Sequence, residues 1–300
     1  MLKEVTGMKP VFTGCGTALI TPFKNGEIDY AALDRIIEEQ IEGGVDALIA
    51  AGTTGEPATM TWEEHLAVIE HVAKRAAGRI PVIAGTGSNS TKEAVEAAQA
   101  CRDSGAVAQL VVTPYYNKTS QEGLIAHFLT IADSDTLPVV VYNVPSRTGI
   151  NIEPATLRRI CEHPQVVAVK EANGDVSQAL EKLRLCGDLA AFYSGNDDLI
   201  APLMACGYQG VISVLSNVMP KETADMAHLL LAGETAQGAA LQLKYLPFIK
   251  ALFSETSPIP CKAAMAMLGK CDEELRLPLV PMQPATRARM ETVMKELSLL

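Results

Sequence analysis

Eight short apolar runs, rich in Val, Ile and Ala, recur along the chain at intervals of roughly 20 to 35 residues, and this recurrence restricts the fold more than any other feature. A small or polar loop follows each run, and then comes a segment whose apolar residues have helical spacing. Such runs predict buried parallel strands that alternate with helices. The runs cover residues 14–20, 47–51, 81–85, 109–113, 138–143, 166–170, 191–194 and 210–214.

The joints between helices and strands repeat as well. Segments 43–50, 104–112 and 206–214 each place a helix-ending Gly before a strand. Eight such units in about 215 residues fit an α/β fold of the (β/α)8 TIM-barrel type, whose typical size is ~250 residues. The alternative, an open doubly wound sheet, fits the repeat less well.

The βα period stops at about Gly233. Beyond it, the sequence has helical patterns at 236–252 and 262–268, and a Pro-broken stretch precedes a last helix. We therefore predict a (β/α)8 barrel over residues 1–233, which would carry the active site, and a C-terminal helical region over residues 234–300.

Charge and cysteine usage exclude several classes of function. With 25 Lys and Arg against 35 Asp and Glu, the net charge is -10, so we expect no nucleic-acid partner. The 7 cysteines stand singly, with no CxxC pair and no His at metal-ligand spacing, which predicts reduced thiols and no metal site. The opening residues lack an apolar h-region, and no run of 18 apolar residues occurs. We expect a cytoplasmic protein without a signal peptide or membrane span.

Lys170 is the sharpest chemical feature, because the carboxyl ends of barrel strands carry the reacting groups in this architecture. It closes the run 166–170, and the period of two places it on one face with Val166 and Ala168, with Glu171 on the opposite face. Desolvation lowers the pKa of a Lys by up to ~3–5 units, which gives the free amine that Schiff-base chemistry requires. The alternative is a Lys at the barrel mouth that reaches water or pairs with a carboxylate.

Three further strand-end features have both a chemical and a structural interpretation. Tyr142 could pass protons in the same mouth, or it could be a core Tyr with a satisfied hydroxyl. Thr53 and Thr54, in a Gly-bracketed turn, could hold a carboxylate or simply form a loop. Arg147 suits bidentate carboxylate binding, or it could be a solvated surface residue. No metalloprotease, P-loop, dinucleotide-binding or nucleophile-elbow motif occurs.

Six ordered motifs resemble the dihydrodipicolinate synthase family, a branch of the pyruvate-dependent class I aldolases and N-acetylneuraminate lyases. They are GTTGE at 52–56, TPYYN at 113–117, YNVPSRTG at 142–149, VKEANGD at 169–175, SGNDD at 194–198 and GVISV at 210–214. The resemblance extends from ALITPF at 18–23 to SPIPCKAAM at 257–265.

The resemblance implies a homotetrameric barrel, a dimer of dimers, without a metal or organic cofactor. Such an enzyme condenses pyruvate with L-aspartate 4-semialdehyde in lysine (diaminopimelate) biosynthesis. Lys170 would form an imine with pyruvate, and the enamine derived from it would attack the aldehyde. Tyr142, Thr53 and Tyr116 would form a proton relay, with Tyr116 reaching into the site of a neighbouring subunit. Thr54 and Arg147 would bind substrate carboxylates. Gly195 and Ile212 would line the pocket through their backbone.

Two other functions stay open. N-acetylneuraminate lyase and the 2-keto-3-deoxy sugar-acid aldolases share the Lys, the Tyr and the GxTGE loop, but they commonly replace the residues matching Arg147 and Tyr116, so the synthase is favoured. A catalytically idle barrel that binds a keto acid or serves as a scaffold is the non-enzyme alternative. The intact set of Lys170, Tyr142 and Thr53 argues against it.

The resemblance also implies an allosteric cleft for lysine at a dimer interface. His65, Asn89, Glu93 and Tyr115 match the pattern of that cleft. Trp62 departs from it, since lysine-inhibited members often carry His there, and an indole could either stack on the aliphatic stem of lysine or block its entry. Our hypothesis is that lysine remains an effector.

Overall fold

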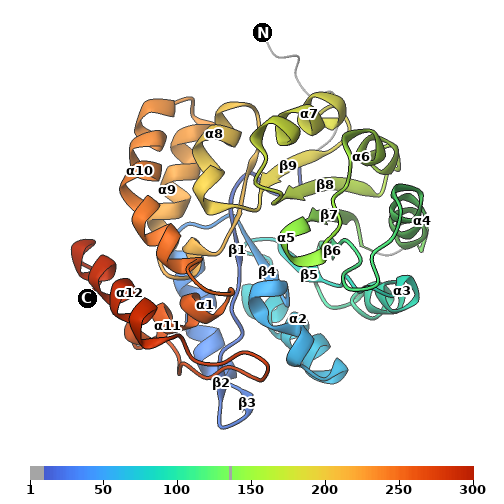
Figure 1. The fold of residues 1–300 in the computed structure, drawn as a ribbon. Coiled ribbons are helices and arrows are strands. Elements are labelled where there is room, and N and C mark those ends of the chain that lie inside the picture. Colours follow the sequence, from blue (N-terminus) through green and yellow to red (C-terminus); the bar gives the residue numbers. More distant parts are fainter. Residues whose placement is uncertain (1–9, 135–136) are drawn as a thin grey trace.

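A closed barrel of eight parallel strands forms the centre of the molecule (Figure 1). The computed structural model describes residues 10–134 and 137–300. The opening residues, on which the expectation of no signal peptide depends, lie largely outside these ranges. The strands are β1 (Gly14–Ala18), β4 (Ala47–Ala50), β5 (Val82–Gly85), β6 (Ala108–Val112), β7 (Val139–Asn143), β8 (Val166–Glu171), β9 (Ala191–Ser194) and β10 (Gly210–Ser213).

The order of the strands decides between the predicted closed barrel and the alternative of an open doubly wound sheet. Neighbours around the barrel follow the order β1-β10-β9-β8-β7-β6-β5-β4, and β1 pairs with β4 to close it. Each strand matches one predicted apolar run. The TIM-barrel prediction is therefore confirmed, and the doubly wound alternative is wrong.

Helices surround the barrel, as expected for βα units (Figure 1). Thr61 and Glu64 begin α2 with a reciprocal capping box, and Asp29 and Ser120 cap α1 and α4 through their side chains. The helices of the repeat are α1 (Tyr30–Glu42), α2 (Trp62–Ala76), α3 (Thr91–Ala100), α4 (Gln121–Ala132), α6 (Pro154–Cys161), α7 (Val176–Cys186), α8 (Ile200–Ala205) and α9 (Pro220–Leu231).

Three C-terminal helices complete the molecule, as predicted: α10 (Thr235–Leu252), α11 (Ile259–Met267) and α12 (Pro284–Glu296). The helix α10 packs against α8 and α9, and α12 lies against α10 and α11. The division of the chain at residue 233 stays a prediction. None of the helices in the described residues has both the length and the apolar content to cross a membrane.

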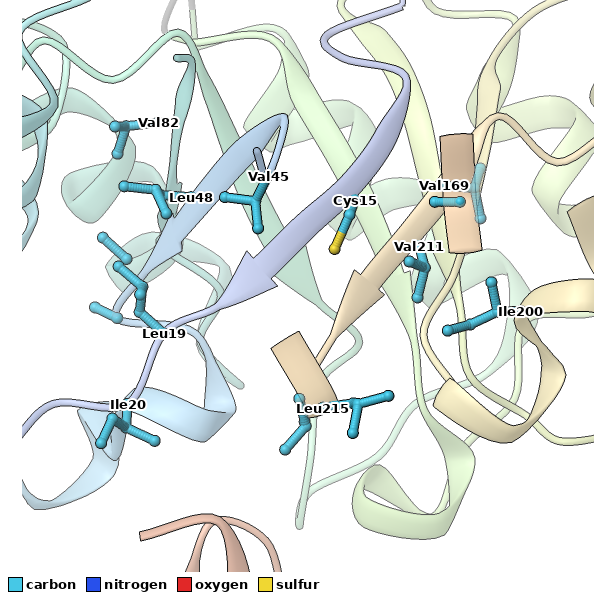
Figure 2. Close-up of a cluster of buried hydrophobic side chains, with 14 of the residues drawn as sticks. Cys15, Leu19, Ile20, Val45, Leu48, Val82, Val169, Ile200, Val211 and Leu215 are labelled. Atoms are coloured by element: carbon cyan, nitrogen blue, oxygen red, sulfur yellow. The ribbon is translucent and has the colours of Figure 1, made fainter. Parts of the chain in front are cut away.

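The apolar core has an inner and an outer layer. Inside the barrel, small and branched side chains such as Ala108, Val140 and Ala168 face one another, and the ring of Tyr193 stacks on Phe12 with centroids 4.2 Å apart. The outer layer lies between the strands and the helices (Figure 2). Alternate residues of each strand supply the two layers.

The strand β8 departs from simple alternation. Val139 of β7 pairs with Val166, but Val140 pairs with Ala168, so β8 contains one extra residue at Val167. Val166 consequently belongs to the outer layer, and Val167 packs against the inner one. The predicted shared face of Val166 and Lys170 is therefore wrong, because a β-bulge changes the alternation at that point. Ala168 faces the interior.

Two short elements were not predicted. The strands β2 (Phe23–Lys24) and β3 (Glu27–Ile28) form a hairpin after β1, and α5 (Pro145–Thr148) is a single turn that follows β7. Both are too short to give a periodic signal in the sequence. The turn α5 matters for the site because it contains Arg147.

Candidate active site

Lys170 lies buried at the carboxyl end of β8, with 5% of its surface exposed. Tyr142 is its register partner on β7, and the Lys170 Nζ lies 4.3 Å from the centroid of the Tyr142 ring. None of the ion pairs among residues 10–134 and 137–300 includes this ammonium. Burial lowers the pKa of Lys170 to about 7, so a large share of the amine is neutral near pH 7.

Glu171, the next residue, points to the opposite face, as the sequence predicted. Its Oε2 accepts a hydrogen bond from Lys182 Nζ of α7 at 2.7 Å, and its Oε1 accepts one from Asn143 Nδ2 of β7 at 2.8 Å. Glu171 and Lys182 are both fully enclosed. The carboxylate nearest in sequence to Lys170 is therefore occupied elsewhere.

Tyr142 is also buried, and burial raises the pKa of its phenol. The guanidinium of Arg147 and a hydrogen bond with Thr53 both act in the opposite direction on that pKa. Thr53 belongs to a short 3-10 turn after β4, Thr53–Gly55, which also contains the buried Thr54. The structure thus brings Lys170, Tyr142 and Thr53 into one connected group.

Arg147 is held at the mouth of the barrel by the C-terminal region. Its Nη2 donates a hydrogen bond to the carbonyl oxygen of Ser257 at 2.9 Å. Its positive charge lowers the pKa of both Lys170 and Tyr142. The guanidinium therefore favours the neutral amine and the ionised phenol.

A cavity of about 890 Å³ opens above these residues. Thr53, Tyr142 and Arg147 line it, and Ser257 and Pro258 contribute the C-terminal part of its wall. Lys170 does not line the cavity itself. Its Nζ lies against the ring of Tyr142, and Tyr142 does line the cavity. A cavity of this size suits a small organic substrate.

Gly195 allows the chain to pass close to Lys170. A Cβ added to Gly195 would lie 3.1 Å from Lys170 Cε and 2.7 Å from the Cβ of Ala172. The Gly195 amide donates to the carbonyl oxygen of Glu171 at 2.7 Å, which joins this loop to the end of β8. Ile212 is buried in the inner layer of the barrel.

Tyr116 is not brought to the other site residues of its own chain. It is 92% exposed, its φ is 69°, and it does not line the cavity, whereas Tyr115 does. A left-handed backbone is costly for a Tyr. The predicted role of Tyr116 across an interface stays a prediction.

Most of the residues considered for the expected lysine cleft also line this cavity. Trp62, His65, Glu93 and Tyr115 all line it. The ring centroids of Trp62 and His65 are 5.6 Å apart, and His65 Nε2 donates a hydrogen bond of 2.7 Å to the Gly85 carbonyl oxygen. Burial lowers the pKa of His65, which favours the neutral ring.

Asn89, the remaining residue of the expected cleft, does not line the cavity. Its carbonyl oxygen accepts a hydrogen bond from Asn117 Nδ2 at 2.9 Å, so it connects the cleft to the TPYYN loop. No group of three or more His, Cys, Asp or Glu side chains in the described ranges could hold a metal ion.

Two buried charged groups next to the site were not predicted from the sequence. Asp197 follows β9, is 2% exposed, and acts electrostatically on Lys170. Lys262 of α11 forms a fully enclosed ion pair with Glu56, next to the Thr53–Gly55 turn. Both residues lie inside quoted motifs, SGNDD and SPIPCKAAM, but only the fold shows that they are buried.

Comparison with known proteins gives a consistent result. The model of the dihydrodipicolinate synthetase family matches residues 11–297. The 4-hydroxy-tetrahydrodipicolinate synthase of Trichlorobacter lovleyi is 47% identical over 290 residues, covering 97% of this chain and 100% of that protein. The crystal structure of dihydrodipicolinate synthase from Aquifex aeolicus has a TM-score of 0.94 at 44% identity, covering 96% of this chain and 99% of that one.

A third relative carries a ligand. The crystal structure of DHDPS from Cyanidioschyzon merolae with lysine bound has a TM-score of 0.93 at 39% identity, and the match covers 97% of this chain and 100% of that one.

The enclosed pair of Glu171 and Lys182 yields a prediction. Lys182→Met should lower the free energy of unfolding by about 3–5 kcal/mol, because it leaves Glu171 as an unpaired buried charge. The double variant Lys182→Met/Glu171→Gln should recover most of this loss. Urea unfolding of the three proteins measures both effects.

Lys221→Met is the matched control, since Lys221 forms an exposed ion pair with Asp225 one helical turn away. It should leave the midpoint of unfolding nearly unchanged. A Lys182→Met protein as stable as the unsubstituted chain would contradict the structural importance of the buried pair.

Proposed function

The chain belongs to the dihydrodipicolinate synthetase family, and on that premise we propose that Lys170 is the residue through which it carries out the reaction of a 4-hydroxy-tetrahydrodipicolinate synthase. The enzyme is a lyase of the pyruvate-dependent aldolase type. It condenses pyruvate with L-aspartate 4-semialdehyde in the diaminopimelate route to lysine. A cytoplasmic location is part of the proposal.

The state of Lys170 is the observation that carries the assignment of its role. Its Nζ lies against the Tyr142 ring in a site that lowers the amine pKa to about 7. A neutral amine is the nucleophile that Schiff-base formation requires. An ordinary Lys, with a pKa of ~10.4, is almost entirely protonated at neutral pH.

The reaction begins when Lys170 Nζ attacks C2 of pyruvate to give a carbinolamine. The former carbonyl oxygen leaves as water, after it takes up one N–H proton and one further proton, and a cationic imine remains. Loss of a methyl proton then gives an enamine, whose terminal carbon bonds to the aldehyde carbon of the second substrate. Each step moves a proton, so a relay beside Lys170 is required.

Tyr142 and Thr53 are suited to that relay because they share a hydrogen bond beside the amine. The Arg147 guanidinium opposes the rise of the Tyr142 pKa, which makes the phenol a better proton donor. Tyr116 from a second copy of the chain would complete the relay. Its full exposure and left-handed backbone support a contact with a partner.

Substrate carboxylates have two candidate partners. Thr54, in the Gly-bracketed turn, would bind the carboxylate of pyruvate. Arg147 would bind the carboxylate of the semialdehyde at the entrance, where its guanidinium is exposed and held by Ser257. Gly195 and Ile212 would line the pocket. The presence of Arg147 and Tyr116 favours the synthase over the sugar-acid aldolases.

The assembly is proposed to be a homotetramer built as a dimer of dimers. In it, each dimer would place Tyr116 of one subunit at the site of the other. Sedimentation velocity tests this assembly directly. An active protein that sediments as a monomer would show that Tyr116 of a second subunit is not needed at the site.

A first prediction concerns the amine. Incubation with pyruvate and borohydride should give one stable adduct, mapped by mass spectrometry to Lys170 and absent from Lys170→Ala. The trapping rate should rise between about pH 6 and pH 8 and then level off, because the reactive neutral amine predominates above the pKa of about 7. A rate that keeps rising to pH 10 would indicate an ordinary Lys.

A second prediction concerns the phenol. Tyr142→Phe should lower kcat by ~10² or more, in line with other general acid–base residues. Tyr208→Phe is a matched control, since Tyr208 is also buried and its hydroxyl donates to the carbonyl oxygen of Ala179. A Tyr142→Phe enzyme within about threefold of the unsubstituted one would remove Tyr142 from the relay.

A third prediction concerns lysine. We expect millimolar lysine to inhibit, with Trp62 stacked on its aliphatic stem and Glu93 opposite its ammonium. Glu93→Gln should weaken inhibition by roughly tenfold, because it removes the opposing charge. Activity unchanged at tens of millimolar lysine would refute lysine as an effector.

A further inference from the structure

Asp197 is a buried carboxylate for which the proton relay has no use. It begins a short 3-10 turn after β9, Asp197–Leu199, and is 2% exposed. Its Oδ2 accepts hydrogen bonds from the amides of Val214 at 3.0 Å and Leu215 at 2.9 Å. Its Oδ1 is buried without a donor among the described residues. Half of the carboxylate is thus held rigidly, and the other half lacks a partner.

The fold brings the segment just before this carboxylate against Lys170. Gly195, two residues earlier, packs so tightly on Lys170 that an added Cβ would lie 3.1 Å from its Cε. Gln242 of α10 holds the turn from behind, since its Nε2 donates to the Asp197 carbonyl oxygen at 3.0 Å and its Oε1 accepts from the Ala201 amide at 3.1 Å. Hydrogen bonds to its side chain and to its backbone carbonyl oxygen therefore hold Asp197 in place.

The charged groups around Lys170 give Asp197 a distinct role. Arg147 on α5 repels a positive charge on Lys170, and Tyr142 offers a neutral ring. Glu171 is on the opposite face and is neutralised by Lys182. Among the described residues, Asp197 is the carboxylate whose charge acts favourably on Lys170.

Among the described residues, the other groups that act on Asp197 are uncharged or thiols. The side chain of Ser213 on β10 lowers the pKa of Asp197. The thiols of Cys15 on β1 and Cys261 on α11 are also buried. Burial raises the pKa of both thiols, and the negative charge of Asp197 raises it further. Among the described residues, Lys170 is the cation whose charge lowers the pKa of Asp197.

We propose that Asp197 is a positioning residue that supplies the counter-charge for Lys170, both as the protonated amine and as the cationic imine. The inference rests on the function proposed for Lys170. Imine formation leaves one fixed positive charge on Nζ, and a buried cation without a counter-charge is strongly disfavoured. Asp197 acts through Lys170 and is not required to touch the substrate.

The test is the pH profile of pyruvate trapping by borohydride in the full-length enzyme. Asp197→Asn keeps an oxygen that accepts from Val214 and Leu215 but removes the charge. The midpoint of the profile should fall by about one pH unit or more, because the negative charge that raises the pKa of Lys170 is gone and a nearby opposite charge changes a pKa by about that amount. The kcat should fall at least tenfold.

Asp198→Asn is the control. It makes the same change in net charge at the adjacent, exposed carboxylate, and its midpoint should equal that of the unsubstituted enzyme. A purely structural role of Asp197 would lower kcat or stability without moving the midpoint. That result would overturn the proposal.

Two further outcomes keep the proposals separate. If the unsubstituted enzyme forms no adduct at all, the role of Lys170 fails. If it forms the adduct and Asp197→Asn has the same midpoint, only the role of Asp197 fails. Should Asp197→Asn not fold, Asp197→Ser replaces it: it removes the same charge with a smaller side chain, its midpoint should fall in the same direction, and an unchanged midpoint overturns the proposal.

Discussion

The ion pair between Glu171 and Lys182 is the interaction on which the candidate site depends. The end of β8 carries a cation and an anion side by side in sequence, and strand geometry sends them to opposite faces. Because Lys182 and Asn143 satisfy Glu171 outside the barrel, Lys170 stays inside without its nearest carboxylate. With Glu171 paired on the other face of the strand, burial remains the largest influence on the pKa of the Lys170 amine.

The same network keeps the reacting side chains in register. Asn143 follows Tyr142 on β7, Glu171 follows Lys170 on β8, and the hydrogen bond between Asn143 and Glu171 joins the two strand ends on the outside. Lys170 and Tyr142 are held opposite each other on the inside as a result. Rigid support of this kind is what allows groups to act within hydrogen-bond reach. The C-terminal helices add Ser257 behind Arg147 and Gln242 behind Asp197.

The sequence predicted the barrel well, because eight apolar runs and the helical patterns between them are strong, repeated signals. It predicted the opposite faces of Lys170 and Glu171 from strand periodicity, but the bulge at Val167 was invisible, since an extra residue leaves no mark in an apolar run. Asp197 was missed for another reason. Its importance depends on burial and on a distant loop at Val214, and neither is encoded in local spacing.

Barrel closure has a consequence for the newly made chain. The strand β1 can pair with β4 early, but its other neighbour, β10, begins about 190 residues after β1 ends. A ribosome that adds about 5–20 residues per second needs roughly 10–40 s to cover that distance. Throughout this interval one edge of β1 exposes unpaired amides and carbonyls, the kind of edge on which chains aggregate. The edge of β1 is therefore covered only after β10 has been synthesised.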